Sequence, residues 1–376
     1  MGDNVKRLAI LGSTGSIGQQ TLEVVRSFPH RFQVMGLAAG TNIELLTKQI
    51  NEFGPKLISI ESASGRERLP SSTCELLSLE EMASHPDVDL LVIAVTGKAA
   101  LAPTLEAIRA KKSIALATKE VLVMAGEIVI SEAKRHNAQI LPIDSEPSAI
   151  WQCLRGEERG VSRLILTASG GPFQHLTSEQ LAQVTPQQAL NHPTWKMGKK
   201  VTIDSATMMN KGFEVIEAHW LFDIPQEKIE VLIHPQSIVH SFVEFVDGSI
   251  KAQLSSPDMR LPIQYALFYP ERLLSDLPRL DLVKIGALTF EAPDLEKFPC
   301  LELALEAGRK GGTYPAVLSA ADEVAVELFL EGRIGFLDIA KLVKETLEQH
   351  QSTPCHSLEE VLTADAWARE RVGIQG

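Results

Sequence analysis

Short apolar runs alternate with amphipathic stretches along the first 145 residues of the chain. Stretches such as Gly18–Ser27 and Ile43–Phe53 repeat their apolar residues at the helical period. The run Leu90–Val95 is apolar at every position, as expected for a central strand that is covered on both sides. Such alternation predicts a parallel sheet with helices on both faces. The predicted strands are 7–11, 33–38, 57–60, 89–95, 113–117 and 138–143.

The pattern changes after Asp144, where the strand-like runs alternate less clearly. Residues 172–200 are polar and carry several prolines, and they predict a flexible flap of the kind that covers an active site. Residues 276–300 lack clear periodicity and are interpreted as a linker. From Leu301 onward the helical period dominates. The strands predicted here are 161–170, 229–233, 238–245 and 249–254, and the helices are 301–310, 315–331, 336–350 and 357–371.

The chain is therefore predicted to be an α/β protein built from three domains. A Rossmann-like parallel sheet forms a dinucleotide-binding domain over residues 1–145. A central α/β catalytic domain covers residues 146–275 and includes the flap at about 172–200. After the linker 276–300, a C-terminal helical bundle covers residues 301–376.

Composition narrows the class of protein. The 376 residues include 36 Lys and Arg against 48 Asp and Glu, and this net charge of −12 disfavours a nucleic-acid partner. The longest apolar run, Leu90–Val95, is far shorter than the ~20 residues that span a membrane. No signal or transit peptide precedes the first strand, so we expect a cytoplasmic protein. Its cysteines are scattered, which excludes a disulfide scaffold and fits a reducing compartment: Cys74, Cys153, Cys300 and Cys355.

A glycine-rich turn follows the first predicted strand. The residues Gly12-Ser13-Thr14-Gly15-Ser16-Ile17-Gly18 lead directly into a helical stretch. Glycines allow the backbone to approach a pyrophosphate closely, and the helix N-terminus offers free N–H groups. The alternative is a tight turn with a purely structural role. The second strand ends in Ala38-Ala39-Gly40-Thr41-Asn42 without the carboxylate that usually binds an NAD ribose, so the pattern allows NADP.

Two polar segments later in the chain are candidates for a metal and phosphate site. Asp144 and Glu146 are two residues apart at the end of a predicted strand, so their carboxylates face the same way and attract Mg²⁺ or Mn²⁺. The alternative is a helix cap with charge in its first turn. In the second segment, 204–214, Ser205, Asn210 and Lys211 are candidates for phosphate binding. Glu214 is a candidate third metal ligand, although a helix cap with surface charges fits this segment equally well.

Several blocks of sequence, in the same order along nearly the whole chain, resemble the 1-deoxy-D-xylulose 5-phosphate reductoisomerase family. This resemblance implies an NADPH-binding N-terminal domain, a catalytic domain, a helical C-terminal domain and a homodimer. It also implies conversion of 1-deoxy-D-xylulose 5-phosphate, a small phosphorylated sugar-like substrate, to 2-C-methyl-D-erythritol 4-phosphate. The matching blocks are Gly12–Gly18, Asp144–Ala149, Ala168–Phe173, His192–Gly198, Asp204–Glu214, His234–Ser237 and Ala320–Glu323.

The resemblance also implies roles for individual residues. Asp144, Glu146 and Glu214 would bind the divalent metal, which is Mg²⁺ or Mn²⁺ with Co²⁺ as a further choice. Glu146, His192 and Lys119 are the catalytic candidates. The residues that would surround the substrate are Lys119, Ser145, Glu146, Ser169, His192, Ser205, Asn210, Lys211 and Glu214. The residues on the NADPH side are Thr14, Gly15, Ser16, Ile17, Gly40, Thr41, Asn42, Thr118, Glu120 and Gly198.

Two positions depart from the family pattern. The family often has a basic residue where Thr41 stands, and it usually has Asn where Thr118 stands. Two other classes of protein also fit parts of the sequence. A simple NAD(P)-dependent dehydrogenase of a phosphorylated sugar-like substrate needs no three-carboxylate site. A non-catalytic NADP-binding regulator explains the glycine turn but not the cluster of phosphate-binding candidates.

Overall fold

The computed structural model describes residues 5–61, 74–157 and 159–375. Within these ranges the chain forms two compact units. Of the described residues, unit 1 contains 5–61, 74–121, 129–145 and 258–277, and unit 2 contains 122–128, 146–157, 159–257 and 278–375. No helix among the described residues is both long enough and apolar enough to cross a membrane.

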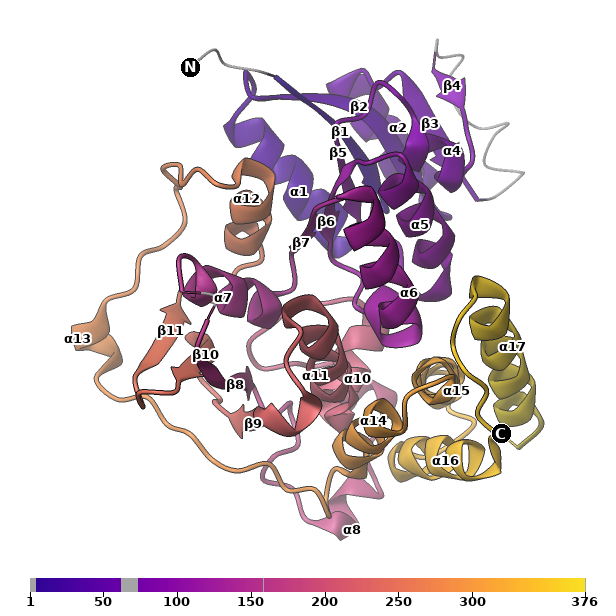
Figure 1. Cartoon of the computed structure of the whole chain (residues 1–376). Coiled ribbons are helices and arrows are strands. Elements are labelled where there is room, and N and C mark those ends of the chain that lie inside the picture. The colour runs from indigo at the N-terminus through magenta and orange to yellow at the C-terminus, as the bar shows by residue number, and fades with distance from the viewer. Residues whose placement is uncertain (1–4, 62–73, 158, 376) are drawn as a thin grey trace. The chain divides into compact units, whose positions relative to one another are not determined.

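Unit 1 contains a seven-stranded sheet in the order β4-β3-β2-β1-β5-β6-β7, and every pair of neighbours is parallel. Strands β2 to β4 lie on one side of β1 and strands β5 to β7 lie on the other, so the strand order reverses at β1 (Figure 1). Ligands bind outside the carboxyl ends of the strands at such a switch point. The strands are β1 (Lys6–Leu11), β2 (Phe32–Ala39), β3 (Leu57–Ile60), β4 (Glu75–Leu76), β5 (Leu90–Ile93), β6 (Ser113–Leu116) and β7 (Ile140–Pro142).

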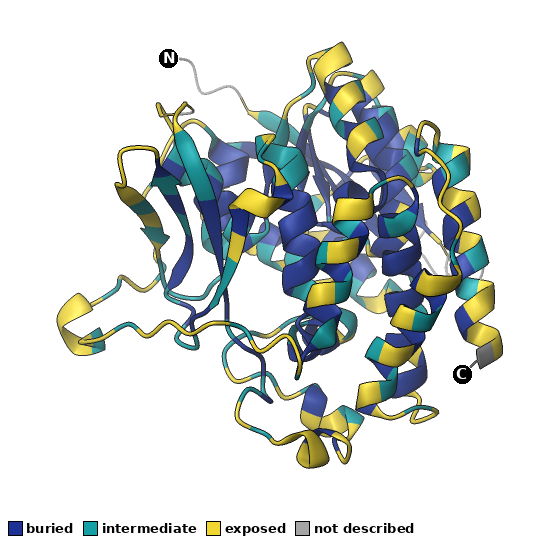
Figure 2. Cartoon of the chain, turned by 60° about the horizontal axis from the view of Figure 1, so that its bottom comes forward, coloured by how far each residue is buried: buried dark blue, intermediate teal, exposed yellow. Residues whose placement is uncertain are grey.

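The central strands of this sheet are buried because their sequences are apolar throughout. All four residues of β3 and of β5 are buried. Figure 2 shows buried residues in dark blue. A strand buried on both faces has no polar side to alternate with, which explains the continuous apolar runs. The helices of this unit are α1 (Ser16–Ser27), α2 (Ile43–Phe53), α4 (Leu79–Ser84), η1 (Gly97–Ala100), α5 (Leu101–Arg109), α6 (Glu120–His136, part of which lies in unit 2) and α12 (Arg260–Phe268).

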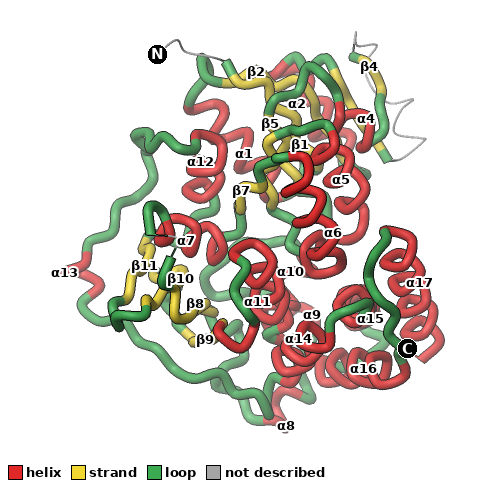
Figure 3. Tube along the Cα trace, viewed as in Figure 1, coloured by secondary structure: helices red, strands yellow, loops and turns green. Residues whose placement is uncertain are grey.

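Unit 2 contains a four-stranded mixed sheet in the order β11-β10-β8-β9, with β11 at one edge (Figure 3). Apolar residues of helices α7 and α11, including Ile150 and Val215, form a core with Leu164, Leu166 and Val243 of the sheet. The strands are β8 (Val161–Ala168), β9 (Ile229–Ile233), β10 (Val239–Phe245) and β11 (Ile250–Leu254). The helices of this unit that precede the C-terminal helices are α7 (Ser145–Leu154), α8 (Ser178–Leu181), α9 (Pro186–Ala189), α10 (Lys199–Thr207), α11 (Met209–Phe222), η2 (Gln226–Lys228) and α13 (Leu282–Ile285).

The C-terminal helices of unit 2 pack around α15 (Tyr314–Leu330). This helix is buried along most of its length, because its sequence is apolar on nearly every side. It contacts α14 (Pro299–Lys310), α16 (Phe336–Gln349) and α17 (Leu358–Gln375), and it also contacts α10 (Figure 1). The helical period of the sequence predicted the first and last residues of these C-terminal helices to within a few positions.

The predicted α/β architecture is confirmed, and two details differ from the sequence-based expectation. The polar segment 172–200 is not entirely loop, since it contains the one-turn helices α8 and α9 and the first residues of α10. Capping boxes at Thr177 and Thr185 begin the two short helices. Residues 258–277 group with unit 1, and the helical bundle belongs to the same unit as residues 146–257. The three functional domains therefore stay a prediction.

Candidate active site

The glycine-rich turn lies between β1 and α1, and close backbone contacts require its glycines. Gly12 has a φ of +91°, and a Cβ atom there would lie 2.4 Å from the carbonyl oxygen of Ala94. A Cβ atom on Gly18 would lie 2.2 Å from the carbonyl oxygen of Gly12. Gly15 precedes α1 as its N-cap. The turn therefore presents the N-terminus of a helix at the end of a central strand, which suits a phosphate group.

Some of the residues predicted for the cofactor lie in this turn or at the end of β2, and the others lie elsewhere in the chain. Ser16 and Thr41 are exposed, and Asn42 caps α2 by accepting a hydrogen bond from the Leu45 amide at 3.1 Å. The Thr118 hydroxyl donates to the carbonyl oxygen of Val95 at 2.5 Å, so this side chain supports the end of β5. The others are Thr14, Ile17, Gly40 and Gly198, which are at least partly exposed, and Glu120, which is buried at the start of α6.

One residue at this edge was missed by the sequence analysis. Glu61 follows β3, and its Oε2 lies 3.4 Å from the place where a Cβ atom on Gly40 would be. A carboxylate therefore stands beside the end of β2, although β2 itself provides none. The signal that could have found it is the carboxyl end of β3, because parallel neighbours end at the same edge of a sheet. The pairing of β2 with β3 is visible only in the structure.

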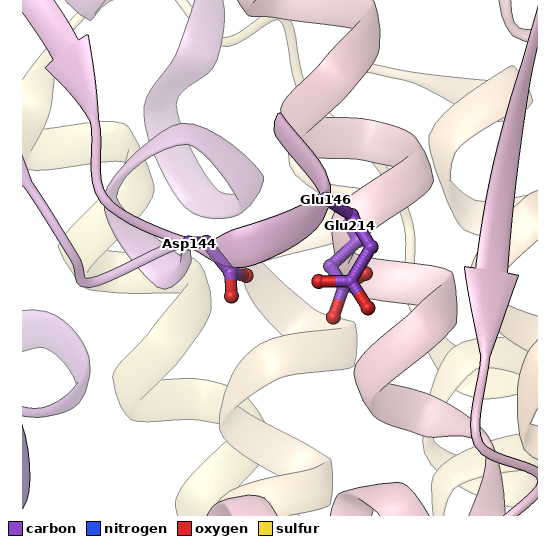
Figure 4. A group of neighbouring side chains, drawn as sticks. All are labelled: Asp144, Glu146 and Glu214. Atoms are coloured by element: carbon purple, nitrogen blue, oxygen red, sulfur yellow. The ribbon is translucent and has the colours of Figure 1, made fainter. Parts of the chain in front are cut away.

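The three predicted metal ligands come together. Asp144 lies just before α7, Glu146 lies in its first turn, and Glu214 lies on α11 (Figure 4). One carboxylate oxygen from each residue can be chosen so that the three atoms lie within 4.8 Å of one another. All three donors are carboxylates, which is the donor set that a hard divalent cation such as Mg²⁺ or Mn²⁺ prefers. The residues present therefore fit the implied metal.

The physical reason given for this convergence was only partly right. The segment is not extended through Glu146, because β7 ends at Pro142 and α7 begins at Ser145. Asp144 Oδ1 accepts a hydrogen bond from the Ser145 amide at 3.0 Å, as expected of a carboxylate at a helix N-terminus. The start of the helix, rather than strand alternation, brings Asp144 and Glu146 to one place. Helix cap and metal ligand are thus compatible descriptions of Asp144.

Two buried lysines balance most of the negative charge of this cluster. Lys119 forms an ion pair with Asp144, and Lys211 forms ion pairs with Glu146, at 2.8 Å, and with Glu214. Burial acts to lower the pKa of Lys211, but the charges of Glu146 and Glu214 outweigh it and raise that pKa above its ordinary value. Lys211 is therefore an ammonium ion at neutral pH.

The segment 204–214 consists of two helices rather than one cap with surface charges. Met208 lies between α10 and α11, has a φ of +67° and is buried like Met209. Glu214 is only 1% exposed, and Asn210 Nδ2 donates to its Oε1 at 2.6 Å. A Cβ atom on Gly171 would lie 2.8 Å from the carbonyl oxygen of Ser205, so the loop after β8 passes directly over α10. The surface-charge interpretation of this segment is therefore wrong.

His192 faces Ser169, and the contacts of its ring determine its tautomer. Nδ1 accepts hydrogen bonds from the backbone amides of Thr194, at 3.1 Å, and Trp195, at 2.9 Å. The hydrogen of the neutral ring is therefore assigned to Nε2, which lies 3.0 Å from Ser169 Oγ. Burial lowers the pKa of His192, so the ring is neutral at pH 7. The solvated loop histidine that the sequence also allowed does not describe this half-buried side chain.

His240, for which the sequence pattern favours a structural role, is buried and lies in the electrostatic field of the cluster. Burial lowers the pKa of His240, and the charge of Glu146 opposes that effect. His240 Nε2 lies 2.8 Å from Ser255 Oγ, and the centroid of its ring is 6.2 Å from that of Trp195. Trp195, in the predicted flap, therefore lies near His240, whose pKa the charge of Glu146 affects.

A parallel sheet with a glycine turn at its switch point, together with a cluster of three carboxylates, is typical of a nucleotide-dependent enzyme that uses a divalent metal. Comparison with known proteins identifies the family within this class. Residues 8–126 match the family model of 1-deoxy-D-xylulose 5-phosphate reductoisomerase. Residues 140–222 and 254–371 match models of C-terminal domains of the same enzyme. The chain belongs to the 1-deoxy-D-xylulose 5-phosphate reductoisomerase family.

Similar proteins span the whole length of the chain. The 1-deoxy-D-xylulose 5-phosphate reductoisomerase of Heliobacterium modesticaldum is 56% identical over 383 residues, with 98% of each chain covered. A solved structure of this enzyme from Zymomonas mobilis in complex with NADPH is 44% identical, with a TM-score of 0.91 and 99% of each chain covered. A DOX-P reductoisomerase structure with NADPH, fosmidomycin and magnesium is 43% identical, has a TM-score of 0.93, and covers 99% of this chain and 98% of that one.

Proposed function

We propose that this chain converts 1-deoxy-D-xylulose 5-phosphate to 2-C-methyl-D-erythritol 4-phosphate in non-mevalonate isoprenoid biosynthesis, with NADPH and a divalent metal held by Asp144, Glu146 and Glu214. Family membership supports the reaction, and it also supports NADPH and magnesium as cofactors. The observation that carries the site assignment is the convergence of these three carboxylates. A simple dehydrogenase has no need of such a cluster.

The chain's own residues bind and orient the substrate in this proposal. When bound, the metal polarises the substrate oxygens and stabilises the negative charge that develops during rearrangement, and NADPH supplies the hydride. Lys119 holds the Asp144 carboxylate in place, and Glu146 is positioned to hold or release a proton at its carboxylate. The proposed contacts to the remaining substrate groups and to the phosphate are Ser145, Ser169, His192, Ser205, Asn210 and Lys211.

The segment 172–200 is proposed to act as the flap that excludes water during the reaction. His192 and Trp195 both lie in it, and both face residues that are outside it, Ser169 and His240 respectively. Exclusion of water strengthens the electrostatic interactions within a site and protects reactive intermediates. The glycine turn, the end of β2, Thr118, Glu120 and Gly198 are proposed to contact NADPH. Thr41 is neutral and Glu61 is acidic, so these two residues would supply no charge attraction for the 2′-phosphate at the end of β2.

The proposed function is tested by following the absorbance of NADPH with purified protein, Mg²⁺ and 1-deoxy-D-xylulose 5-phosphate. We expect NADPH oxidation that requires all components, stops with a chelator and returns with added Mg²⁺. A dehydrogenase without rearrangement would keep its activity in the chelator, and a regulator would bind NADPH without oxidising it. Folded protein that gives no oxidation in the complete mixture would disprove the proposal.

The protonation state of His192 predicts how substrate binding depends on pH. The pKa of His192 in the folded protein lies below the unfolded value of about 6.5, so the ring is neutral above that value. The neutral ring stabilises the folded site, and this stabilisation is lost as the pH falls through the lowered pKa. Protonation would place a hydrogen on Nδ1, against two amide donors. We expect the KM for substrate to rise by up to about tenfold per pH unit once the ring is protonated.

The matched control for this pH profile is His192→Gln. This variant retains the titration of the substrate phosphate but has no imidazole, so the difference between the two profiles isolates the histidine. A wild-type profile that coincides with that of His192→Gln between pH 5 and 7 would contradict the assigned role.

A homodimer and a cytoplasmic location are further parts of the proposal. β11 lies at a sheet edge, and Ile250 on it is 52% exposed, so a second copy could pair along this strand. We expect Ile250→Lys to shift the wild-type dimer towards monomer in sedimentation velocity, because it places a charge on this edge. Ile374→Lys, on an exposed position of α17, should leave the dimer intact. A monomeric wild type, or a fully dimeric Ile250→Lys variant, would exclude this interface.

The proposed cytoplasmic location is supported by the four free cysteines, which fit a reducing compartment.

A further inference from the structure

An ammonium group outside the carboxylate cluster, on a side chain that is 16% exposed, connects three helices of unit 2. Lys200 Nζ lies 2.5 Å from Asp204 Oδ2 and 2.9 Å from Asp322 Oδ2. It also lies 4.8 Å from the centroid of the Phe213 ring, within the range of a cation–π interaction. Asp204, Phe213 and Asp322 are each at most 1% exposed. Lys200 and Asp204 belong to α10, Phe213 to α11 and Asp322 to α15.

Three of these four residues, Lys200, Asp204 and Phe213, are next to a proposed site residue or at the end of the flap. Lys200 is in the first turn of α10, which begins just after Gly198 at the end of the flap. Asp204 directly precedes Ser205, and Phe213 directly precedes Glu214. Asp322 contributes no proposed substrate contact, and its helix α15 is the buried centre of the helical bundle. The ammonium group thus joins the site-bearing helices to a rigid support.

The charges of this network make its geometry difficult to change. Two buried carboxylates face one ammonium group. Replacement of Lys200 by an uncharged residue would therefore remove the positive charge that stabilises both carboxylates in a low-dielectric interior. An exposed pair such as Lys344–Glu348 on α16, at 3.9 Å, contributes little because water already solvates both groups. A buried network is therefore costly to displace, and it holds the backbone that carries it in a defined place.

We propose that Lys200 is a positioning residue that, through Asp204 and Asp322, fixes the first turn of α10 against α15. It thereby holds Ser205 in position to bind the substrate, and it fixes the position of the C-terminal end of the flap. Lys200 acts through these neighbours and has no contact with substrate of its own. The proposal rests on the proposed function, since it assumes that Ser205 binds substrate.

The test measures kcat and KM for 1-deoxy-D-xylulose 5-phosphate, and the dissociation constant of NADPH, for Lys200→Met and Asp322→Asn. Misplacement of a site element by about 1 Å can lower a rate by up to about a hundredfold. We therefore expect kcat/KM for the substrate to fall by about ten- to a hundredfold, with most of the loss in KM. NADPH affinity should fall much less, because the proposed cofactor contacts belong to unit 1 apart from Gly198, the N-cap of α10.

Two further variants separate positioning from general destabilisation. Lys200→Arg supplies a cation that can bridge both carboxylates, so it should restore most of kcat/KM. Lys344→Met removes an exposed lysine of the same unit and should behave as wild type. If Lys200→Met does not fold, Asp322→Asn decides the matter, because it preserves the shape of the side chain and the Lys200–Asp204 pair.

Three results would overturn the proposal. The first is a folded Lys200→Met or Asp322→Asn protein with wild-type kcat/KM, and the second is a Lys200→Arg protein that is no better than Lys200→Met. The third is a loss of NADPH affinity equal to the loss for substrate, which indicates a general defect. Failure of the proposed function has a different signature, since the wild-type protein itself would then leave the substrate unchanged.

Discussion

Replacing Glu214 by Gln should lower kcat by about a hundredfold or more while the affinity for NADPH stays near that of the wild type. The amide keeps the shape of the side chain, and its single oxygen can still accept a hydrogen bond from Lys211 or from Asn210, which donate to different oxygens of Glu214. It removes one of the three negative charges that would hold the cation, so the Mg²⁺ concentration for half-maximal activity should rise. Steady-state kinetics over a Mg²⁺ series and fluorescence titration with NADPH measure both effects.

The matched control is Glu348→Gln, which makes the same change at an exposed position of α16. This variant should have wild-type kcat and Mg²⁺ dependence. The site assignment is wrong if Glu214→Gln loses NADPH binding but retains the Mg²⁺ dependence of the wild type. It is equally wrong if the two glutamine variants are indistinguishable.

The second large effect is expected at the glycine turn. In Gly18→Ala, the new Cβ atom would lie 2.2 Å from the carbonyl oxygen of Gly12, so the backbone of the turn must move. Overpacking of this kind costs ~1–3 kcal/mol, which is partly a loss of stability and partly a loss of the geometry that binds the pyrophosphate. We expect NADPH affinity to fall by about ten- to a hundredfold. Titration with NADPH and thermal unfolding measure the two contributions.

Gly373→Ala is the control for this substitution. A Cβ atom at Gly373 meets no heavy atom within 4 Å, and the residue lies within α17, where alanine is favoured over glycine. This variant should bind NADPH as the wild type does and should be no less stable. Wild-type NADPH affinity in Gly18→Ala would show that the turn does not position the cofactor.

Much of the fold could be predicted because its periodicities are strong. The strands β3 and β9 and the helix α2 begin and end where the apolar pattern placed them. The short helices α8 and α9 were missed, since four residues are too few to show a helical period. Their capping boxes, which begin at Thr177 and Thr185, and Pro186 at the start of α9 were local signals.

The candidate site was predictable where its residues are close in sequence. Asp144 and Glu146 lie two positions apart, so their common location could be inferred, although the start of a helix rather than a strand explains it. Contacts between distant residues could not be inferred in this way. The hydrogen bond between Ser169 and His192, the position of Glu61 beside Gly40 and the pairing of Lys200 with Asp322 all depend on tertiary packing.

The pairing of Lys119 and Lys211 with the acidic cluster has a consequence for handling the protein. These two ammonium groups act as internal counter-ions, so the carboxylates do not repel one another strongly enough to force the helices apart. Stripping of the metal during purification should accordingly be reversible, and the protein should regain its activity on simple addition of Mg²⁺ without a refolding step.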